Sequence, residues 1–242
     1  MLLVTGDTHA EQYKYIECIS PYLHKHDTLI IAGDFGYGWW DGEFLPQEMF
    51  FDFIASRPYT VCFVDGNHEV HHKLNELPVM DWNGGKAHII RHNLIHLMRG
   101  EIYNIEGKKI FVMGGGYSLD KDWRTPGISW FPEEMPSEAE YLNAEANLLK
   151  NDNRVDYIIT HTCPTKIVEY LSSVSAKGVN KNVFDERPLN DFLQNICERV
   201  DFKHHYFGHF HMDYPDMFGK YTAIYNCIRR LDNGKIIHRW DL

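Results

Sequence analysis

Eight polar residues stand where apolar runs end, and their types suit the binding of divalent metal ions. They are Asp7, His9, Asp34, Asn67, His68, His161, His209 and His211. Carboxylate oxygens and imidazole nitrogens together suit cations such as manganese, iron, zinc, cobalt or nickel. The set holds more ligand-type groups than one tetrahedral ion needs, so it suits two ions that share a carboxylate. We therefore expect these strand ends to converge on one metal site.

The elements that must position these residues are short apolar strands joined by helices. Strands are predicted over residues 1–5, 27–32, 59–65, 155–160 and 203–207, and helices over 10–24 and from Pro46. The order strand, helix, strand, helix, strand at the start of the chain predicts parallel pairing with right-handed crossovers. Sheets of this kind bind ligands at the carboxyl ends of their strands, where the eight polar residues stand.

The rest of the chain predicts a mixed architecture. Four short strand-like runs between residues 87 and 113 predict a mainly antiparallel portion that could form a second sheet. The capping-box spacing at Ser137 predicts a helix after it, and Pro188–Val200 is a predicted helix, whereas residues 172–187 are predicted to form a loop. The runs 221–230 and 235–240 predict a closing hairpin. Since no repeat or obvious linker interrupts the chain, we expect one domain over residues 1–242.

The polar residues fall into five sequence blocks. These are Asp7-x-His9, Gly33-Asp34, Gly66-Asn67-His68-Glu69, His161 and Gly208-His209-x-His211. The blocks and their order resemble those of the calcineurin-like metallophosphoesterase family. The resemblance implies an α/β fold, a four-layer sandwich of two facing mixed β-sheets flanked by helices. It also implies an enzyme that uses two metal ions to hydrolyse a phosphate mono- or diester.

Carried over position by position, the resemblance implies a role for each residue. One ion would be held by Asp7, His9, Asp34 and His211, and the second by Asp34, Asn67, His161 and His209. Asp34 would bridge the two ions. A metal-bound hydroxide would attack phosphorus, and His68 would act as general acid by donating a proton to the leaving group. Asn67, His68 and Arg124 are the candidate substrate-binding residues.

One block departs from the pattern of a related group. In phosphoprotein phosphatases the second block has the pattern Gly-Asp-x-x-Asp-Arg-Gly, whereas this chain has Tyr37 at the position of the second aspartate. The departure disfavours a Ser/Thr phosphoprotein substrate. It also leaves open which residue orients His68, and Glu69 is one candidate.

Loop residues near the predicted site have two interpretations. The aromatic residues Trp39, Trp40, Trp123, Trp130 and Phe131 either pack loops against the core or form a wall that stacks on an aromatic leaving group such as a nucleobase. The basic residues Lys121, Arg124, Lys166 and Arg187 lie in stretches that could overhang the metal ions. Among them, Arg124 is the preferred phosphate contact.

Other chemistries are weaker alternatives. The run from His68 to His72 fits the zinc-protease pattern His-Glu-x-x-His, but that pattern requires a helix, whereas His68 follows a strand. We expect His71 and His72 at the solvated start of a short helix. Cys163 could be a nucleophile. Within the same fold, the alternatives are a nuclease or nucleotide phosphodiesterase, or a non-catalytic binding scaffold.

Composition limits the partners. The chain has 24 basic and 34 acidic residues, a formal net charge of −10. This balance disfavours long nucleic acids, whose binding needs a dense basic surface. The expected partner is a small phosphorylated substrate, which is compatible with the acidic balance because bound cations would invert the local field. Five scattered cysteines and the lack of a signal peptide or membrane-spanning run indicate a cytoplasmic protein without membrane contact. The sequence leaves the oligomeric state unknown.

Overall fold

An eight-stranded mixed sheet combines amino-terminal strands with two carboxy-terminal strands in this computed structural model, which describes residues 1–39, 46–174 and 185–241. Its centre consists of β1 (Leu2–Thr5), β2 (Thr28–Ala32), β3 (Thr60–Val64) and β6 (Leu94–Leu97), all parallel. Antiparallel strands extend both edges: β5 (Gly85–Arg91) and β4 (Val79–Trp82) beyond β6, and β13 (Cys227–Arg230) and β14 (Ile236–Arg239) beyond β1.

A six-stranded sheet faces the first. Its parallel strands are β8 (Lys108–Met113), β9 (Tyr157–Thr160), β10 (His204–Phe207) and β12 (Tyr221–Ala223). Antiparallel edges are formed by β7 (Ile102–Ile105) and β11 (Tyr214–Met217). The two sheets therefore each have a parallel centre, and β1–β3 and β8–β10 end in the loops that contain the predicted site.

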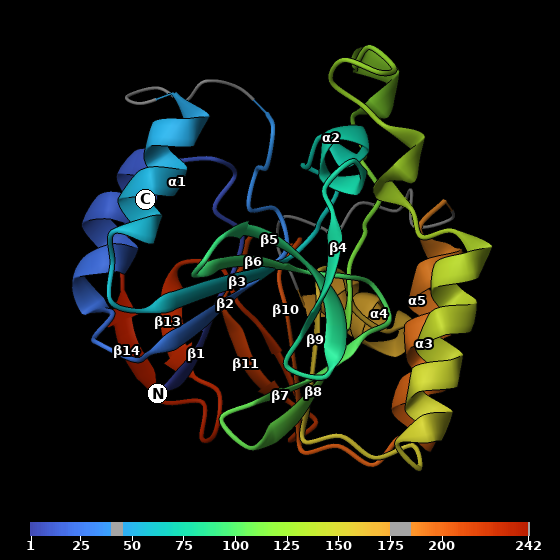
Figure 1. Ribbon diagram of the computed structural model, residues 1–242. Helices are drawn as coiled ribbons and strands as arrows, with labels where there is room; N and C mark the ends of the chain where they lie inside the picture. The colour runs from blue at the N-terminus through green and yellow to red at the C-terminus, as the bar shows by residue number, and fades with distance from the viewer. Residues whose placement is uncertain (40–45, 175–184, 242) are drawn as a thin grey trace.

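Helices cover the outer face of each sheet, which gives the four layers seen in Figure 1. Outside the first sheet lie a π-helical turn (Lys14–Ile19), a 3₁₀ turn (Ser20–Tyr22) and α1 (Gln47–Ala55). Outside the second lie α3 (Glu138–Lys150), α4 (Thr165–Val174) and α5 (Arg187–Arg199). Short elements lie between them: α2 (His71–Asn75) and 3₁₀ turns at Lys121–Trp123 and Pro132–Glu134. The predicted four-layer α/β sandwich is confirmed.

The central strands read as continuous apolar runs because both of their faces are buried. Val4 and Ile30 point into the layer between the sheets, where they join Ile110 and Ile159. The neighbouring Leu3 and its equivalents on β2 and β3 point outward and pack against the helices. Burial on both faces makes the strands a rigid base for the residues that follow them.

Several sequence-based boundaries were wrong. The middle strands do not form a separate sheet, because β5 and β6 extend the first sheet while β7 and β8 begin the second. The run 221–230 is split between β12 and β13, which belong to different sheets, although the predicted hairpin between β13 and β14 is present. Residues 172–174 end α4 rather than a loop, and residues 175–184 lie outside the described part of the chain.

The capping box predicted at Ser137 is confirmed. The Ser137 hydroxyl accepts from the Glu140 amide, and the Glu140 carboxylate accepts from the Ser137 amide at 2.6 Å. None of the helices in residues 1–39, 46–174 and 185–241 has the length and apolar composition needed to cross a membrane.

Candidate metal centre

The eight predicted site residues lie in loops that follow strands of both sheets. Asp7 and His9 follow β1, Asp34 follows β2, and Asn67 and His68 follow β3. From the second sheet, His161 follows β9, and His209 and His211 follow β10. Because parallel strands end at one edge of a sheet, these loops meet, and each of the eight residues contacts at least one other.

One group comprises Asp7, His9, Asp34 and His211, whose potential ligand atoms all lie within 4.8 Å of one another. Oδ2 of Asp7 lies 3.3 Å from Nε2 of His211 and 3.9 Å from Nε2 of His9. Both carboxylates are buried, whereas the His211 side chain is half exposed. Two carboxylates and two imidazoles at this spacing could hold a divalent cation.

A second group surrounds Nε2 of His161. Oδ1 of Asn67 lies at 3.0 Å, Nδ1 of His209 at 3.1 Å and Oδ2 of Asp34 at 3.4 Å. The other nitrogen of His161, Nδ1, lies 3.1 Å from the carbonyl of Ala32 and must donate to it. Nε2 therefore faces acceptor atoms and must either carry a second proton or share a cation with them. The donor set fits a divalent metal ion.

The carboxylate of Asp34 touches both groups. Its Oδ2 lies 3.1 Å from Nε2 of His9 and 3.4 Å from Nε2 of His161, and its Oδ1 accepts from the His68 amide at 2.7 Å. Burial raises the pKa of Asp34, but His161 and His68 lower it well below its usual range. Burial lowers the pKa of His161, and Asp34 followed by Asp7 raises it to about 10. The opposite directions of the two pKa shifts reflect the attraction between the Asp34 carboxylate and the His161 ring.

The backbone is left-handed at four of the eight residues. His9, Asp34, His209 and His211 have φ angles of 50°, 51°, 65° and 48°. This conformation costs an L-residue roughly 1–2 kcal/mol, so the surrounding contacts must hold it in place. Sequence reasoning did not foresee it.

Glycines let the ligand side chains lie directly against the neighbouring backbone. A Cβ atom on Gly33 would lie 2.0 Å from Nδ1 of His161, and one on Gly66 would lie 2.1 Å from Oδ1 of Asp34. No side chain fits at such distances. The glycines of these blocks are thus required by close approach as well as by the turn of the chain.

His68 faces Arg124 rather than a carboxylate. The two ring nitrogens of His68 lie 3.3 Å and 3.5 Å from the two terminal nitrogens of Arg124, so the guanidinium lies across the ring. Tyr37, at the position where phosphoprotein phosphatases have aspartate, instead stacks on Phe51 in the core. Burial lowers the pKa of His68 to about 4, with Asp34 opposing and His9 and Arg124 adding to the shift.

A cavity of about 360 Å³ opens beside His68 and Arg124. Its other lining residues are His9, Trp39, Asp120 and Ser129. The Arg124 guanidinium lies 5.5 Å from the centre of the Trp39 ring, and Nε of Arg124 donates to Asp120 at 2.7 Å. The cavity therefore combines a guanidinium, an aromatic face and two imidazoles next to the two groups of candidate ligands.

The other loop residues of interest lie elsewhere. Phe131 is buried, whereas Trp123 is 92% exposed and so does not pack a loop against the core. Trp40 lies outside the described residues. Lys121, Lys166 and Arg187 form ion pairs with Asp185, Glu198 and Asp191, respectively. Of the four basic candidates, only Arg124 has a contact with a site residue in the described part of the chain.

The expectation of a solvated helix start holds for His72, which is exposed, but was wrong for His71. His71 begins α2 as expected but is buried rather than solvated, and its Nε2 lies 3.0 Å from the carbonyl of Gly66. Because α2 begins only at His71, His68 is not helical, as the zinc-protease pattern would require. Cys163 is fully buried next to α4, which removes the alternative of an accessible nucleophile.

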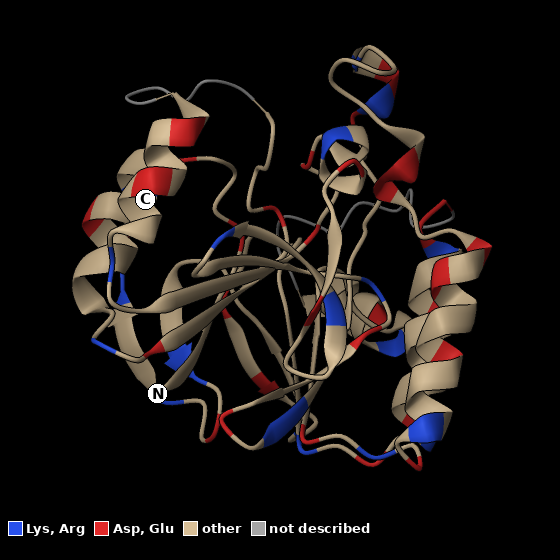
Figure 2. Cartoon of the chain, viewed as in Figure 1, with Lys and Arg blue, Asp and Glu red and all other residues tan. Residues whose placement is uncertain are grey.

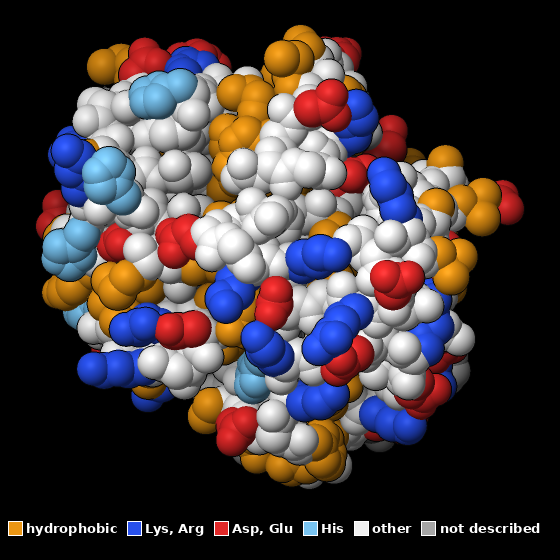
Figure 3. Space-filling model, turned by 60° about the horizontal axis from the view of Figure 1, so that its bottom comes forward, with side chains coloured by type: hydrophobic (Ala, Val, Ile, Leu, Met, Phe, Trp, Pro, Cys, Tyr) orange, Lys and Arg blue, Asp and Glu red, His pale blue; other side chains and the backbone are white. Residues whose placement is uncertain are grey.

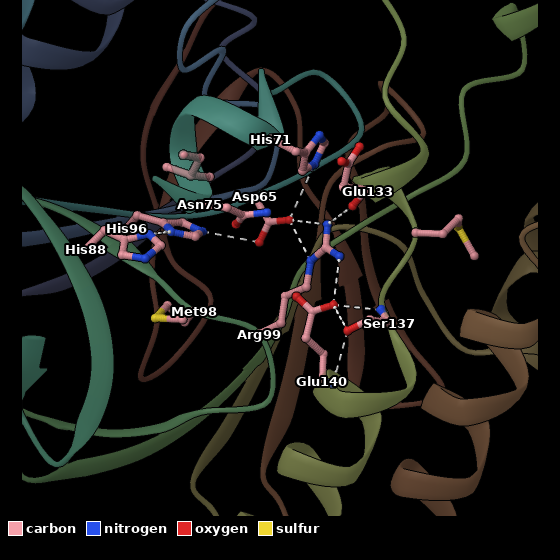
Figure 4. A pocket seen from close by; sticks show the side chains of 12 residues that line it. Asp65, His71, Asn75, His88, His96, Met98, Arg99, Glu133, Ser137 and Glu140 are labelled. Atoms are coloured by element: carbon pink, nitrogen blue, oxygen red, sulfur yellow. Dashed lines mark hydrogen bonds and ion pairs between the residues drawn. The ribbon is translucent and has the colours of Figure 1, made fainter. Parts of the chain in front are cut away.

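A buried ion pair supports the turn that carries Asn67 and His68 (Figure 4). Oδ2 of Asp65 accepts from Nε of Arg99 at 2.7 Å and lies 2.6 Å from its Nη2. Nε2 of His96 lies 3.3 Å from Oδ1 of Asp65, and His96 in turn contacts His88. Figure 4 shows these side chains converging on Asp65. They line a cavity of about 290 Å³.

Three buried glutamates contact the loops that carry the candidate ligands, and two of them, Glu134 and Glu186, were not predicted from the sequence. Glu69 accepts from the amides of Gly36 and Gly66 at 3.0 Å and 2.6 Å, so it joins two ligand loops instead of orienting the His68 ring. Glu134 accepts from Ser118, and Oε1 of Glu186 lies 3.1 Å from Nε2 of His209. Only Glu69 had a sequence signal, because it adjoins His68.

Comparisons with known proteins agree with this geometry. A family model described as calcineurin-like phosphoesterase matches residues 1–213. The lariat debranching enzyme of Schizosaccharomyces pombe is 27% identical over 232 residues, covering 88% of this chain and 47% of that protein. UPF0046 protein T07D4.2 of Caenorhabditis elegans is 25% identical over 235 residues, covering 92% of this chain and 54% of that protein. The chain thus spans about half the length of these curated relatives.

A solved structure shares the fold. A putative 5'-nucleotidase from Staphylococcus aureus matches with a TM-score of 0.50 and 14% identity, over 99% of this chain and 52% of that chain. At this identity the likeness concerns the fold alone. Because the family model spans residues 1–213, the chain belongs to the calcineurin-like phosphoesterase family, a family of metal-dependent enzymes.

Proposed function

We propose that the protein hydrolyses a phosphate mono- or diester with the help of two divalent metal ions. The observation that carries the proposal is the position of Asp34, whose Oδ2 faces His9 of one ligand group and His161 of the other. Asp7, His9, Asp34 and His211 would hold the first ion, and Asp34, Asn67, His161 and His209 the second. When bound, two such ions neutralise phosphoryl oxygens and make water a nucleophile near neutral pH.

The residues at the mouth of the cluster would bind the substrate and move a proton. Arg124 presents its guanidinium at the cavity beside His9 and His68, where it can hold a phosphoryl oxygen. His68 is the candidate general acid, because its ring faces the same cavity while its backbone amide is held by Asp34. The negative charge of a bound phosphate would favour the protonated ring, against the effects of burial, His9 and Arg124, which lower the pKa of His68.

A small phosphorylated compound fits this surface better than a long nucleic acid. Acidic and basic residues are interspersed along the chain in Figure 2, and basic side chains lie beside acidic ones on the face shown in Figure 3. The formal charge of −10 gives the protein as a whole little general attraction to duplex phosphates. The five cysteines are free thiols, which fits a reducing cytoplasm.

A nucleotide phosphodiesterase is the second candidate. Trp39 and Arg124 line the cavity, and both can stack on the base of a leaving nucleoside. The similarity to a lariat debranching enzyme points the same way.

The test is a substrate panel. Purified protein, freed of metal with a chelator and reloaded with manganese, zinc, iron, cobalt or nickel, would be assayed on p-nitrophenyl phosphate and bis-p-nitrophenyl phosphate. We expect activity that disappears on chelation and returns on reloading. Full activity after verified metal removal, or none with any metal, would overturn the proposal. A nucleotide phosphodiesterase would prefer the diester and nucleoside esters.

A further inference from the structure

The ligands of the two proposed ions differ in how they are supported. The side chains of His9 and His211, proposed for the first ion, are 18% and 50% exposed. Asn67 and His161, proposed for the second, are buried, and the His209 side chain is only 13% exposed. The second group also has two buried glutamates behind it, Glu134 and Glu186.

Glu186 fixes the position of the proton on His209. Its Oε1 accepts from the backbone amide of Tyr117 at 2.9 Å. Its Oε2 accepts from the hydroxyl of Thr162 at 2.9 Å and from the side-chain amide Nδ2 of Asn190 at 3.2 Å. A carboxylate in this setting acts only as an acceptor, so Nε2 of His209, 3.1 Å from Oε1, must donate to it. Nδ1 of neutral His209 is then left with a lone pair, 3.1 Å from His161.

Glu134 has the corresponding effect on Asn67 through Ser118. The Ser118 hydroxyl donates to Oε2 of Glu134 at 2.6 Å, so its oxygen is free to accept from Nδ2 of Asn67 at 3.1 Å. The Ser118 amide donates to Oε1 of Glu134 at 3.0 Å, which fixes the serine. With Nδ2 held on one side, Oδ1 of Asn67 must point to His161 on the other. An amide flip is thereby excluded.

We propose that Glu186 and Glu134 are positioning residues for the second metal ion, joined by the adjacent residues Tyr117 and Ser118. Each glutamate directs a lone pair of one ligand, His209 or Asn67, toward the same point beside His161. Neither glutamate touches the first group in the described contacts. The inference rests on the proposed two-metal function, and it predicts that the second ion depends on these glutamates while the first does not.

The test measures metal binding rather than turnover. Manganese would be titrated into metal-free wild type, Glu186→Gln and Ser118→Ala, with stoichiometry and affinity from calorimetry and electron paramagnetic resonance for magnetic coupling between the ions. Ser118→Ala breaks the link to Asn67 with little change in volume. The matched control is Glu101→Gln, a buried glutamate that accepts from Lys86 and Asn143 away from the site.

We expect wild type and Glu101→Gln to bind two coupled ions. In Glu186→Gln and Ser118→Ala, one ion should bind as before and the other about 10–100-fold more weakly. At manganese concentrations that fill only the tighter site, the resonance spectrum should therefore show single manganese ions without magnetic coupling. If wild type binds two ions and both variants keep the affinities and the coupled signal, the inference is wrong and the proposed function stands. If wild type binds fewer than two ions, the proposed function fails and the inference with it.

Discussion

The carboxylate of Asp65 and the guanidinium of Arg99 form a buried ion pair, with Oδ2 of Asp65 at 2.7 Å from Nε and 2.6 Å from Nη2 of Arg99. Both side chains are at most 5% exposed. Arg99 also donates to the carbonyls of Glu133 and Glu134, so it connects the segment around Glu134 to the turn that follows β3.

Asp65→Asn should therefore lower the free energy of unfolding by about 3–5 kcal/mol, because the buried guanidinium keeps only the more distant carboxylate of Glu140, at 3.4 Å, as a charged partner. Chemical denaturation measures the change. Asp81→Asn is the control, since it removes the same charge from a pair with Lys86 whose side chains are 84% and 52% exposed, and it should leave the free energy of unfolding nearly unchanged. Equal effects of the two substitutions would show that Asp65 contributes no more than a surface charge.

Asp34→Asn should cost both ions, because a neutral amide cannot bridge two cations. The expected result is a loss of bound metal and of turnover on an aryl phosphate, measured by elemental analysis and by assay. Asp232→Asn, which removes an exposed carboxylate paired with Arg230, should change neither quantity. Two tightly bound ions and full turnover in Asp34→Asn would refute the bridge.

His68→Ala should keep the metal ions and slow turnover. The contact with Asp34 comes from the backbone amide of residue 68, which alanine retains. With an alkyl leaving group, which needs a proton, kcat should fall about 10²–10⁴-fold, and with p-nitrophenol the fall should be smaller. An equal loss on both substrates would argue against the general-acid role.

Arg124→Ala should weaken binding of the phosphate group more than it slows the chemistry. A charged hydrogen bond is worth about 1.5–3 kcal/mol, so KM and the inhibition constant of inorganic phosphate should rise about 10-fold or more. Arg124→Lys keeps the charge but not the planar contact with His68, and should recover only part of the loss. Arg230→Ala serves as the control for loss of a surface cation. Unchanged phosphate inhibition in Arg124→Ala would remove this residue from the site.

Cys163→Ala should leave turnover unchanged. The thiol is fully buried against α4, in the cluster that contains Ile167 and Phe207, and cannot reach a substrate. A modest fall in stability is expected from the small cavity. A folded Cys163→Ala protein that binds metal but has lost its activity would reopen the cysteine mechanism.

The convergence of the strand-end residues can be predicted from the sequence for a physical reason. Asp7, Asp34 and His161 each follow an apolar run, and parallel strands buried on both faces must end at a common edge. The same reasoning fails for Glu186 and Glu134. Their partners, His209 and Ser118, are distant in sequence, and no periodicity marks a glutamate that becomes buried only when loops from different strands meet.

Strand assignment failed where burial is weak. Val79 and Met80 of β4 are exposed at the edge of the first sheet, and β11 contains Pro215 and a register shift, so neither strand shows an alternating apolar pattern. The chain also moves from one sheet to the other between β12 and β13, at Ile224–Asn226, without a turn signal that separates the two strands. Such changes of sheet are set by packing between the sheets and not by local sequence.

The left-handed backbone at His9, Asp34, His209 and His211 has a consequence for protein design. Copying only the side chains onto regular loops of another scaffold would aim them differently, because the direction of each Cα–Cβ bond depends on φ. A transplant of this centre must therefore carry whole turns, including the glycines against which the side chains lie. Libraries that randomise Gly33 or Gly66 should yield few members that retain bound cations.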